Sequence, residues 1–342
     1  MKYLAAMSGG VDSSVAALLL LRSGHEVEGG IMKLSPFSDG SDVVSAQSVC
    51  DTLGIKLNVI DATDRFRTCV MDPFCRGYLD GLTPNPCVFC NNKLKFGYFA
   101  ELAESLGFDG IATGHYADIA FRGGRYAVKA GACAEKDQSY FLWNVGQKAL
   151  SRTVFPLRGV SSKDEVRVIA RDAKLPVASK SDSQDICFVK DGEYAELIEK
   201  LTGIRMPEGN FTDRDGNVLG RHRGLLNYTL GQRRFLNVAA GKRIFVVEKK
   251  PDENEVVLGD ETELFRTTVR AKDVRMQLYP SLENAEMNVK IRSGPRTVRA
   301  KVTAADGGFA EVVFEKPVRA PAPGQSVVFY DTDTVAGGGY IC

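Results

Sequence analysis

The chain of 342 residues has few features that would place it outside ordinary globular proteins of a reducing compartment. Its eight cysteines are too sparse for a disulfide scaffold. No apolar run approaches a membrane span, and residues 1–4 show no charged leader with a small-residue cleavage site. Lysine and arginine number 44 against 43 acidic residues, so the net charge of +1 gives no global reason to expect nucleic acid. These absences favour a cytoplasmic protein without a membrane partner, on which any nucleic-acid surface is local.

The chain also lacks the lysine-bearing phosphate loop G-x-x-x-x-G-K-[ST]. In its place, Ser8-Gly9-Gly10-Val11-Asp12-Ser13 follows the apolar run 4–7 and precedes the helical run 15–21. A strand, a glycine turn and a helix in this order make a phosphate cradle, because backbone N–H groups close around the anion at a helix N-terminus. Hydroxyls of Ser8, Ser13 and Ser14 add donors, and Asp12 would hold hydrated Mg²⁺ or cap the helix. The alternative is a plain glycine turn with a Ser/Asp cap.

Up to about residue 200, strand and helix patterns alternate. Short apolar runs at 27–34, 56–61 and 109–113 indicate buried strands, and the spacing over 93–106 indicates a helix with one buried face. The alternation predicts an α/β fold with a doubly wound parallel sheet. Ligands of such domains gather at the carboxyl ends of the strands, where the Ser8–Ser13 loop lies.

Beyond about residue 203, turn signals become dense. Residues 213–217 form a turn signal, and 298–304 with 310–314 predict a β-hairpin. Alternation at 289–292 and 327–330 indicates strands with one wet face. We therefore expect three domains: a catalytic domain over 1–203, a small central domain over 204–268, and an antiparallel β-barrel over 269–342.

Two stretches are basic and free of acidic residues. Residues 216–247 carry six Lys/Arg, and residues 287–305 carry five. Such stretches suit a phosphate backbone. Solvated faces of a barrel are an equally good explanation on charge alone.

The segment 83–91, Thr-Pro-Asn-Pro-Cys-Val-Phe-Cys-Asn, carries a C-x-x-C pair. Prolines on both sides of Asn85 predict a rigid turn that presents Cys87 and Cys90 just before a helix beginning near Lys93. The helix N-terminus, with Lys93 and Lys95, is expected to lower the pKa of these thiols. The pair alone is compatible with half of a zinc site, a redox pair or two ligands of an iron–sulfur cluster.

A further cysteine, Cys187, lies between the polar residues 181–185 and an apolar stretch that is interpreted as the end of a strand. A lone cysteine beside Ile186 and Phe188 is usually a small core residue. Together with the phosphate loop at Ser8–Ser13 and an exposed C-x-x-C, the better interpretation is a sulfur carrier. The other five cysteines have no such context and are interpreted as core or surface residues: Cys50, Cys69, Cys75, Cys133 and Cys342.

Two further polar segments fit a site at the sheet edge. His115 follows a buried strand and so emerges where ligands bind; the alternative is a satisfied core histidine. Residues 136–140 contain no apolar side chain before Tyr140, which suits a surface contact loop; the alternative is a plain helix start.

Seven motifs, in this order, resemble those of the tRNA-specific 2-thiouridylases, and the first is also the SGGxDS loop of ATP pyrophosphatases. They are SGGVDSS at 8–14, TPNPCVFCN at 83–91, ATGHYA at 112–117, KDQSYFL at 136–142, KSDSQDICF at 180–188, YTLGQRR at 228–234 and PGQSVVFY at 323–330. The resemblance covers nearly the whole chain. It implies an ATP-pyrophosphatase domain, a small central domain and a β-barrel that binds tRNA.

The resemblance also implies site residues. ATP, with Mg²⁺, would be bound by Ala6, Met7, Ser8, Gly9, Gly10, Val11, Asp12, Ser13, Met32 and Gly114. Cys90 matches the nucleophile of the family and Cys187 its persulfide carrier. The stretch that meets the target base is Asn85, Pro86 and Cys87, and other tRNA contacts fall on His115, Lys136, Asp137, Gln138, Arg292, Ser293 and Gln325.

The implied reaction adenylates the C2 oxygen of the wobble uridine, position 34, and replaces it with sulfur, releasing AMP and pyrophosphate. Sulfur would come from a persulfide on Cys187, directly or as hydrosulfide released by Cys90, and a Cys90–Cys187 disulfide can result. The partners are then tRNA, a sulfur donor protein or sulfide source, and a reductant.

One position departs from the family pattern, because Cys87 stands where aspartate usually follows Asn-Pro. This removes an acid–base group and supplies a third thiol beside Cys90 and Cys187. Three thiols could hold a [4Fe–4S] cluster with one open iron, so a cluster route and a persulfide route both stay open. Other functions to be distinguished are sulfur transfer to another tRNA position, an amide-forming synthetase, and a noncatalytic RNA-binding protein with structural zinc.

Overall fold

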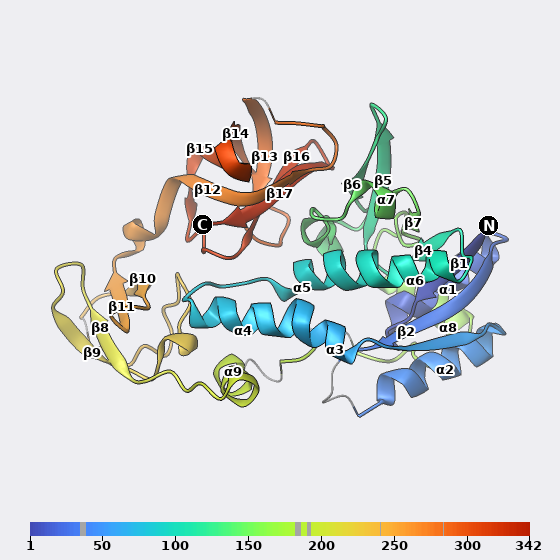
Figure 1. The fold of residues 1–342 in the computed structure, drawn as a ribbon, viewed down its shortest axis with the longest axis horizontal. Coiled ribbons are helices and arrows are strands. Elements are labelled where there is room, and N and C mark those ends of the chain that lie inside the picture. Colours follow the sequence, from blue (N-terminus) through green and yellow to red (C-terminus); the bar gives the residue numbers. More distant parts are fainter. Residues whose placement is uncertain (35–38, 182–185, 190–192, 240, 283) are drawn as a thin grey trace.

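The computed structural model describes residues 1–342 apart from 35–38, 182–185, 190–192, 240 and 283. The described strands form a five-stranded, a four-stranded and an eight-stranded sheet. In Figure 1 the five-stranded sheet lies near the N-terminus, the four-stranded sheet is yellow to ochre, and most of the large sheet is orange to red.

The five-stranded sheet is parallel throughout. Its order is β3-β2-β1-β4-β7, with bounds β1 (Lys2–Ala6), β2 (Glu26–Lys33), β3 (Leu57–Asp61), β4 (Gly110–Ala112) and β7 (Thr153–Val154). After β3 the chain crosses to the far side of β1, so a ligand crevice is expected at the carboxyl ends of β1 and β4. The predicted doubly wound α/β fold is confirmed.

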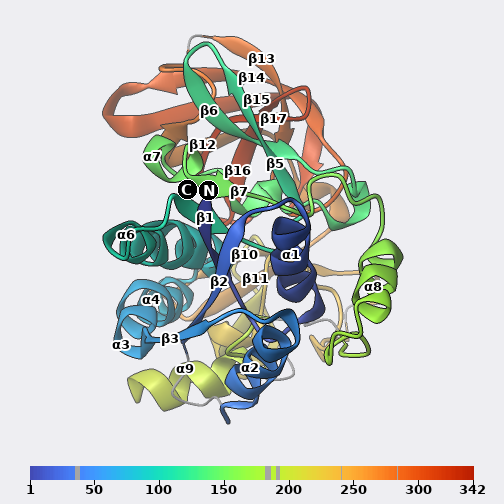
Figure 2. The same cartoon turned by 90° about the vertical axis from the view of Figure 1, so that its right-hand side faces the viewer.

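Alternate residues of β1 pack into two different hydrophobic cores, because successive side chains of a strand point to opposite faces of the sheet. Tyr3 packs with Val15 and Val49 of helices α1 (Val11–Arg22) and α2 (Ser41–Leu53), which lie with α8 (Lys163–Asp172) on one face. Leu4 packs with Phe99 of α6 (Phe99–Ser105) on the other. Figure 2 shows these helices on opposite sides of the sheet.

A long helical segment runs through α5 (Pro86–Phe89), the π-helical η2 (Cys90–Tyr98) and α6. The other helices and helical turns are α3 (Thr63–Phe66), η1 (Arg67–Met71), α4 (Asp72–Leu79), η3 (Ala134–Lys136), η4 (Ser139–Phe141), α7 (Gln147–Leu150), α9 (Tyr194–Thr202), η5 (Leu225–Asn227), η6 (Glu261–Leu264) and η7 (Asp306–Gly308). Within the described ranges, no helix has both the length and the apolar character needed to cross a bilayer.

The four-stranded sheet has the order β10-β11-β8-β9. Its strands are β8 (Gly209–Thr212), β9 (Val218–His222), β10 (Phe245–Lys250) and β11 (Glu255–Gly259). Phe211 and Val256 lie at the centre of its core. The predicted turn at 213–217 connects β8 to β9, where Asp213 accepts hydrogen bonds from the backbone of Asp215 and Asn217 at 2.9 Å each.

Six antiparallel strands close into a barrel because β12 pairs with both β15 and β17. They are β12 (Phe265–Met276), β13 (Ala285–Lys290), β14 (Val298–Ala305), β15 (Phe309–Arg319), β16 (Ser326–Asp331) and β17 (Thr334–Ile341). The predicted barrel and its hairpin, now β14–β15, are confirmed. Strand β12 crosses the predicted 268/269 domain boundary.

The large sheet also includes a hairpin from the first part of the chain, which the sequence analysis did not anticipate. Strands β5 (Ala117–Arg122) and β6 (Arg125–Ala130) extend it at β17, through the pair Thr334 and Lys129. Buried polar contacts strengthen this junction: Trp143 Nε1 donates to Ser326 Oγ at 2.9 Å, and Tyr140 donates to the Ser326 carbonyl at 2.8 Å. The barrel is therefore fixed on the parallel domain by hydrogen bonds as well as packing.

Candidate active site

The Ser8–Ser13 loop lies between the carboxyl end of β1 and the first turn of α1. Gly9 has φ of +67° and Gly10 is the N-cap, so the turn depends on glycine. The Ser13 hydroxyl lies 3.1 Å from Ser8 Oγ and donates to the Gly10 carbonyl at 3.0 Å. These side chains form hydrogen bonds within the loop. The backbone N–H groups at the start of α1, which have no partner inside the helix, therefore keep an orientation that suits an anion.

Gly114, which follows β4, touches this helix start. A Cβ at Gly114 would lie 2.8 Å from Ser13 N and 2.9 Å from Asp12 C, both of them backbone atoms. No larger residue fits this approach without a shift of the backbone. Gly114 therefore packs directly on the start of α1, and its role in ATP binding stays a prediction.

Two lysines that the sequence analysis missed also reach the loop. Lys163 at the start of α8 donates to both carboxylate oxygens of Asp12, at 2.8 and 2.7 Å, and Tyr116 donates to the same carboxylate at 2.7 Å. Lys180 donates to the Gly9 carbonyl at 3.0 Å. The Gly10 N-cap receives no side-chain cap, so the suggestion that Asp12 caps the helix is wrong. No signal near Lys163 links it to residue 12, 151 positions away, because only the crossover topology brings them together.

The cysteine segment begins a helix instead of preceding one, so that prediction is wrong. The Asn85 side chain accepts a hydrogen bond from Cys87 N at 3.1 Å and caps α5, while Pro86 occupies the first turn. Proline is compatible with that position because its missing N–H would have no intrahelical partner there. Cys87 is exposed in the first turn, and Cys90 lies partly buried one turn later.

The thiols do not have the lowered pKa values that the helix start and the lysines led us to expect. Desolvation by the surrounding atoms raises the pKa of Cys90 and also that of Cys87, although part of the Cys87 side chain reaches the surface; the opposing effect of Lys95 is smaller. At Cys187, loss of hydration first and then the nearby Cys90 and Cys87 raise the pKa to about 12. Desolvation therefore outweighs the helix end and favours the neutral form of these thiols.

Cys187 lies in a turn and not at a strand end. Its neighbours Ile186 and Phe188 pack in a cluster that also contains Met32 and Cys90, which brings a predicted ATP-binding residue and two catalytic candidates into one region. Residues 182–185 of the same motif lie outside the described residues. All eight cysteines are free.

The three thiols do not form a metal site in this structure. Among the described residues, no group of three or more His, Cys, Asp or Glu side chains is placed to hold a metal ion. The mutual effects of Cys87, Cys90 and Cys187 on pKa show that they lie within electrostatic reach of one another. Their arrangement does not fit the cluster hypothesis, and we derive no step through a cluster.

His115 is buried and satisfied. Its Nδ1 lies 2.7 Å from Thr113 Oγ1, and its ring packs against Phe96 and Phe155. Burial, and then the charge of Lys95, lowers its pKa well below the usual range. The tRNA contact predicted for His115 stays a prediction; the structure places it as a packing link between β4 and η2.

The 136–140 segment is only partly a surface loop. Lys136 is exposed, but Asp137 forms a nearly buried ion pair with Lys290 of β13 at 3.0 Å, and Gln138 accepts from Tyr116 N at 3.0 Å. Asp137 and Gln138 therefore join the barrel and the segment after β4. Their predicted contact with tRNA is not tested by these bonds.

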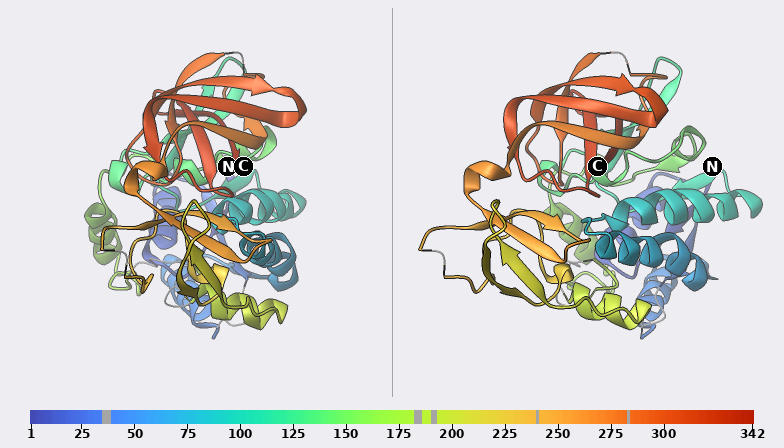
Figure 3. Two further views of the ribbon diagram at one scale, coloured as in Figure 1. Left: turned by 90° about the vertical axis from the view of Figure 1, so that its left-hand side faces the viewer. Right: turned by 60° about the vertical axis from the view of Figure 1, so that its left-hand side comes forward.

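The loop before Asn85 is held by both other domains. Gln325 Nε2 donates to the Thr83 carbonyl at 2.9 Å, and Thr83 N donates to the Pro323 carbonyl at 2.8 Å. From the central domain, Pro251 lies so close to Gly81 that a Cβ there would be 2.5 Å from its Cγ. The loop that leads to the cysteine helix therefore lies where three domains meet. Figure 1 labels α5 at the end of this loop, below the barrel, and Figure 3 shows the barrel and the central domain from two further sides.

The remaining predicted tRNA residues lie on the barrel surface. Arg292 is exposed and bonds through its guanidinium to the Arg319 carbonyl, while Ser293 is exposed beside it. Within the part of the chain that the structure describes, neither residue bonds to the thiols, and their role in RNA binding stays a prediction.

Three family models match consecutive parts of the chain. They are the tRNA methyl transferase HUP domain over residues 1–191, the tRNA methyl transferase PRC-barrel domain over 197–260 and the aminomethyltransferase beta-barrel domain over 266–341. Among curated relatives, the tRNA-specific 2-thiouridylase MnmA of Caldicellulosiruptor saccharolyticus is 44% identical, covering 99% of this chain and 98% of the relative. Those of Acetivibrio thermocellus and Clostridium acetobutylicum are 43% and 42% identical, each match covering 99% of both chains. With such end-to-end similarity, the chain belongs to the tRNA-specific 2-thiouridylase family.

Proposed function

We propose that this protein is a tRNA 2-thiouridylase, a sulfurtransferase that adenylates O2 of the wobble uridine at position 34 and replaces that oxygen with sulfur. The observation that carries the proposal is a phosphate cradle and a group of thiols built around the same strand ends. Gly114 touches Ser13 of the cradle, and the next residue, His115, packs on η2, the helix that bears Cys90. Lys95 acts electrostatically on His115 and on all three thiols.

The first step activates a poor electrophile. Uridine O2 attacks the α-phosphorus of ATP, pyrophosphate leaves, and C2 then carries AMP as a leaving group. Backbone N–H groups at the start of α1 would bind the phosphates, with Lys163 and Lys180 as the nearby cations. When bound, Mg²⁺ neutralises phosphate charge, and the Asp12 carboxylate is a suitable oxygen ligand once Lys163 turns to the phosphates.

The second step transfers sulfur. The terminal sulfur of a Cys187 persulfide attacks C2 and AMP leaves; the Cys90 thiolate then attacks Sγ of Cys187, which releases 2-thiouridine and forms a Cys90–Cys187 disulfide. Alternatively, Cys90 attacks the persulfide first and frees hydrosulfide as the nucleophile. Both routes need an external persulfide donor and a dithiol reductant for each turnover.

The cluster route predicts something that the persulfide route does not. Anaerobically purified protein would contain iron and labile sulfide, and Cys87→Ala would remove them together with activity. We expect instead a metal-free preparation that thiolates at full rate, with Cys87→Ala retaining activity. Stoichiometric iron that is required for sulfur transfer would replace the persulfide route by the cluster route.

Mass analysis of tRNA nucleosides from cells with and without the gene tests the proposed function. We expect 2-thiouridine at the wobble position to disappear on deletion and to return with a plasmid copy. Loss of a nucleoside thiolated elsewhere would assign the enzyme to another tRNA position. Unchanged 2-thiouridine, with no second copy of the gene, would contradict the proposal.

A further inference from the structure

A second basic region lies far along the chain from the ATP loop, at the junction of the central domain and the barrel. A cavity of about 580 Å³ is lined there by Arg233, Arg234, Phe235, Arg243, Glu261 and Arg319, among other residues. We call these six residues the junction surface. Its first four members belong to the acid-free basic stretch 216–247.

The charge of the junction surface is largely uncompensated. Arg319 lies 3.5 Å from Glu261 and over the Phe245 ring at 5.4 Å, so part of its charge is compensated. Arg233, Arg234 and Arg243 are exposed, and no ion pair within the described part of the chain neutralises them. Three exposed guanidinium groups around one cavity are the electrostatic pattern of a phosphate-binding site.

Phe235 adds an aromatic surface to this charge. Its side chain is 84% exposed, and its φ of +64° is unfavourable for a bulky residue. The exposed ring is not explained by packing, and strained backbone of this kind concentrates at ligand sites. An exposed ring among arginines is the combination on which unpaired bases stack.

The junction surface is continuous with the barrel residues already expected to meet tRNA. A Cβ at Gly231 would lie 3.1 Å from Ala320 Cβ, and Arg292 donates to the carbonyls of Arg319 and, at 3.5 Å, Ala320. The two domains that form the surface also hold the 81–83 loop that leads to Cys87. A chain lying along this surface would therefore be directed toward the thiols.

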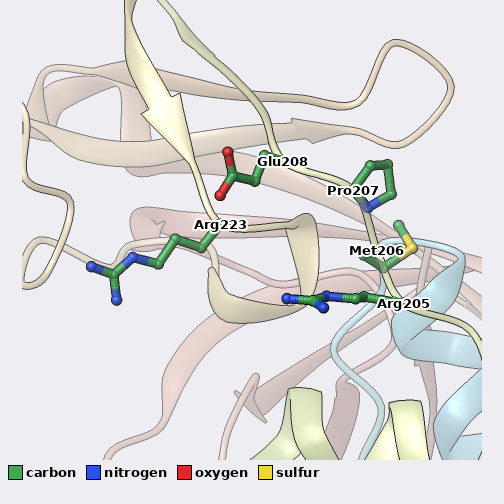
Figure 4. Close-up of a pocket in the computed structure, with 5 residues that line it drawn as sticks. All are labelled: Arg205, Met206, Pro207, Glu208 and Arg223. Carbon is green, nitrogen blue, oxygen red and sulfur yellow. The ribbon is translucent and has the colours of Figure 1, made fainter.

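Another cavity shows that basic residues alone do not make such a site. It measures about 490 Å³ and is lined by Arg205, Met206, Pro207, Glu208 and Arg223 (Figure 4). Glu208 offsets part of the charge, and no aromatic ring is present among the lining residues. The junction surface differs in having both an excess of positive charge and an exposed ring.

We propose that the junction surface binds the sugar–phosphate backbone of RNA through Arg233, Arg234 and Arg243 and stacks one unpaired base on Phe235. This inference rests on the proposed function, since it assigns part of the tRNA contact to residues outside the ATP and thiol sites. It commits to RNA because an exposed ring among guanidinium groups recognises a base next to its phosphates, whereas an acidic protein would be recognised by the charges alone.

The salt dependence of tRNA binding tests the charge contacts. For full-length protein and an unmodified tRNA transcript, the Arg233→Ala/Arg234→Ala double variant is expected to lower the slope of log Kd against log salt by about 1.5, since each phosphate contact contributes about 0.7 to 0.9. The control, Arg22→Ala/Arg171→Ala, removes the same charge from exposed positions on α1 and α8, on one face of the parallel sheet. It should leave the slope unchanged.

A second variant tests the stacked base. Phe235→Ala is expected to raise the Kd for tRNA at least about fivefold without changing the salt slope, and Phe235→Tyr to restore binding. The rate of ATP–pyrophosphate exchange, measured at saturating tRNA and without a sulfur donor, should be the same in all variants. An equal Kd and slope for wild type and both sets of variants would overturn the inference and leave the proposed function intact.

Two other outcomes separate the inference from the function it rests on. Wild-type protein that binds no tRNA would overturn both. Variants with normal tRNA binding but slow sulfur transfer from a donor protein would show that the junction surface receives the donor, which overturns the RNA assignment alone.

Discussion

The ATP loop and the thiol site are built in different ways. Hydrogen bonds between residues at most five positions apart close the loop, among them Ser8 with Ser13 and Ser14 with Gly10. The thiols come from two segments about 100 residues apart, and the loop before Cys87 is held by bonds from Thr83 to the barrel. The difference teaches that the turn of the loop forms locally, although Gly114, Lys163 and Lys180 reach it from distant segments, whereas the thiol site depends on contacts between three domains.

The largest expected effect separates the two sites chemically. Cys90→Ala or Cys187→Ala should reduce 2-thiouridine formation by a factor on the order of 10³ or more, because each thiol is a bond-forming group. ATP–pyrophosphate exchange with tRNA should remain. Cys342→Ala, at an exposed thiol in the barrel, is the control and should thiolate normally. A thiol variant that loses the exchange reaction as well would show that the two sites are not separable.

The next effect concerns the assembly of the domains. Asp137→Ala leaves Lys290 nearly buried and unpaired, so it should destabilise the junction of barrel and parallel domain by about 3 kcal/mol. Trp143, the only tryptophan, donates to Ser326 at that junction, and its fluorescence during urea unfolding reports the change. Glu286→Ala, which breaks an exposed pair with Arg299, should cost less than about 1 kcal/mol. Equal midpoints for the two variants would contradict a structural role for the buried pair.

The thiol site should also be slow toward alkylation. With a pKa raised from 9.0 to about 12, Cys187 has about 10³-fold less thiolate at pH 8, and higher intrinsic nucleophilicity recovers part of this. We expect alkylation by iodoacetamide roughly 30-fold slower than for a free cysteine peptide, with a rate that keeps rising as pH approaches 12. Peptide mass mapping measures the rate at Cys187, with Cys342 as internal reference. A plateau near pH 9 would show that desolvation does not control this thiol.

The smallest of these effects tests the loop. Gly114→Ala forces a Cβ against the backbone of Asp12 and Ser13, so the KM for ATP in pyrophosphate exchange should rise about tenfold, the equivalent of 1–3 kcal/mol of overpacking. Gly159→Ala, where a Cβ meets open space, is the matched control. If both variants keep the wild-type KM, the close approach of β4 to α1 does not shape the ATP site.

Much of the fold was predictable because its signals are local. Apolar runs predicted β2, β3 and β4 to within two residues at each end, and turn chemistry predicted the β14–β15 hairpin. The attachment of β5 and β6 to the barrel sheet was not predictable, since its strand pair, Thr334 with Lys129, and hydrogen bonds such as Val128 N to Gln277 join residues about 150 to 205 positions apart. Local patterns determine strands, whereas pairing between domains depends on the folded surfaces.

In the candidate site, too, local features were predictable and contacts between distant segments were not. The cradle was predicted from Ser8 to Ser13, but Lys163 was missed because the crossover topology alone brings it to Asp12. The direction of the thiol pKa shifts was predicted wrongly, because burial depends on packing from distant segments and outweighs Lys95. The start of the helix at Pro86 was missed because proline was interpreted as a helix breaker, although it is favoured in the first turn.

Reconstitution with defined components tests the central claim most directly. Purified protein, an unmodified tRNA with uridine at position 34, Mg²⁺-ATP, a persulfide donor and a dithiol reductant would be combined, and the RNA digested to nucleosides for mass analysis. The account predicts 2-thiouridine at position 34 with one AMP and one pyrophosphate released per sulfur transferred, and none with the Cys90→Ala/Cys187→Ala double variant. No 2-thiouridine from the wild type, or equal amounts from the double variant, would contradict it.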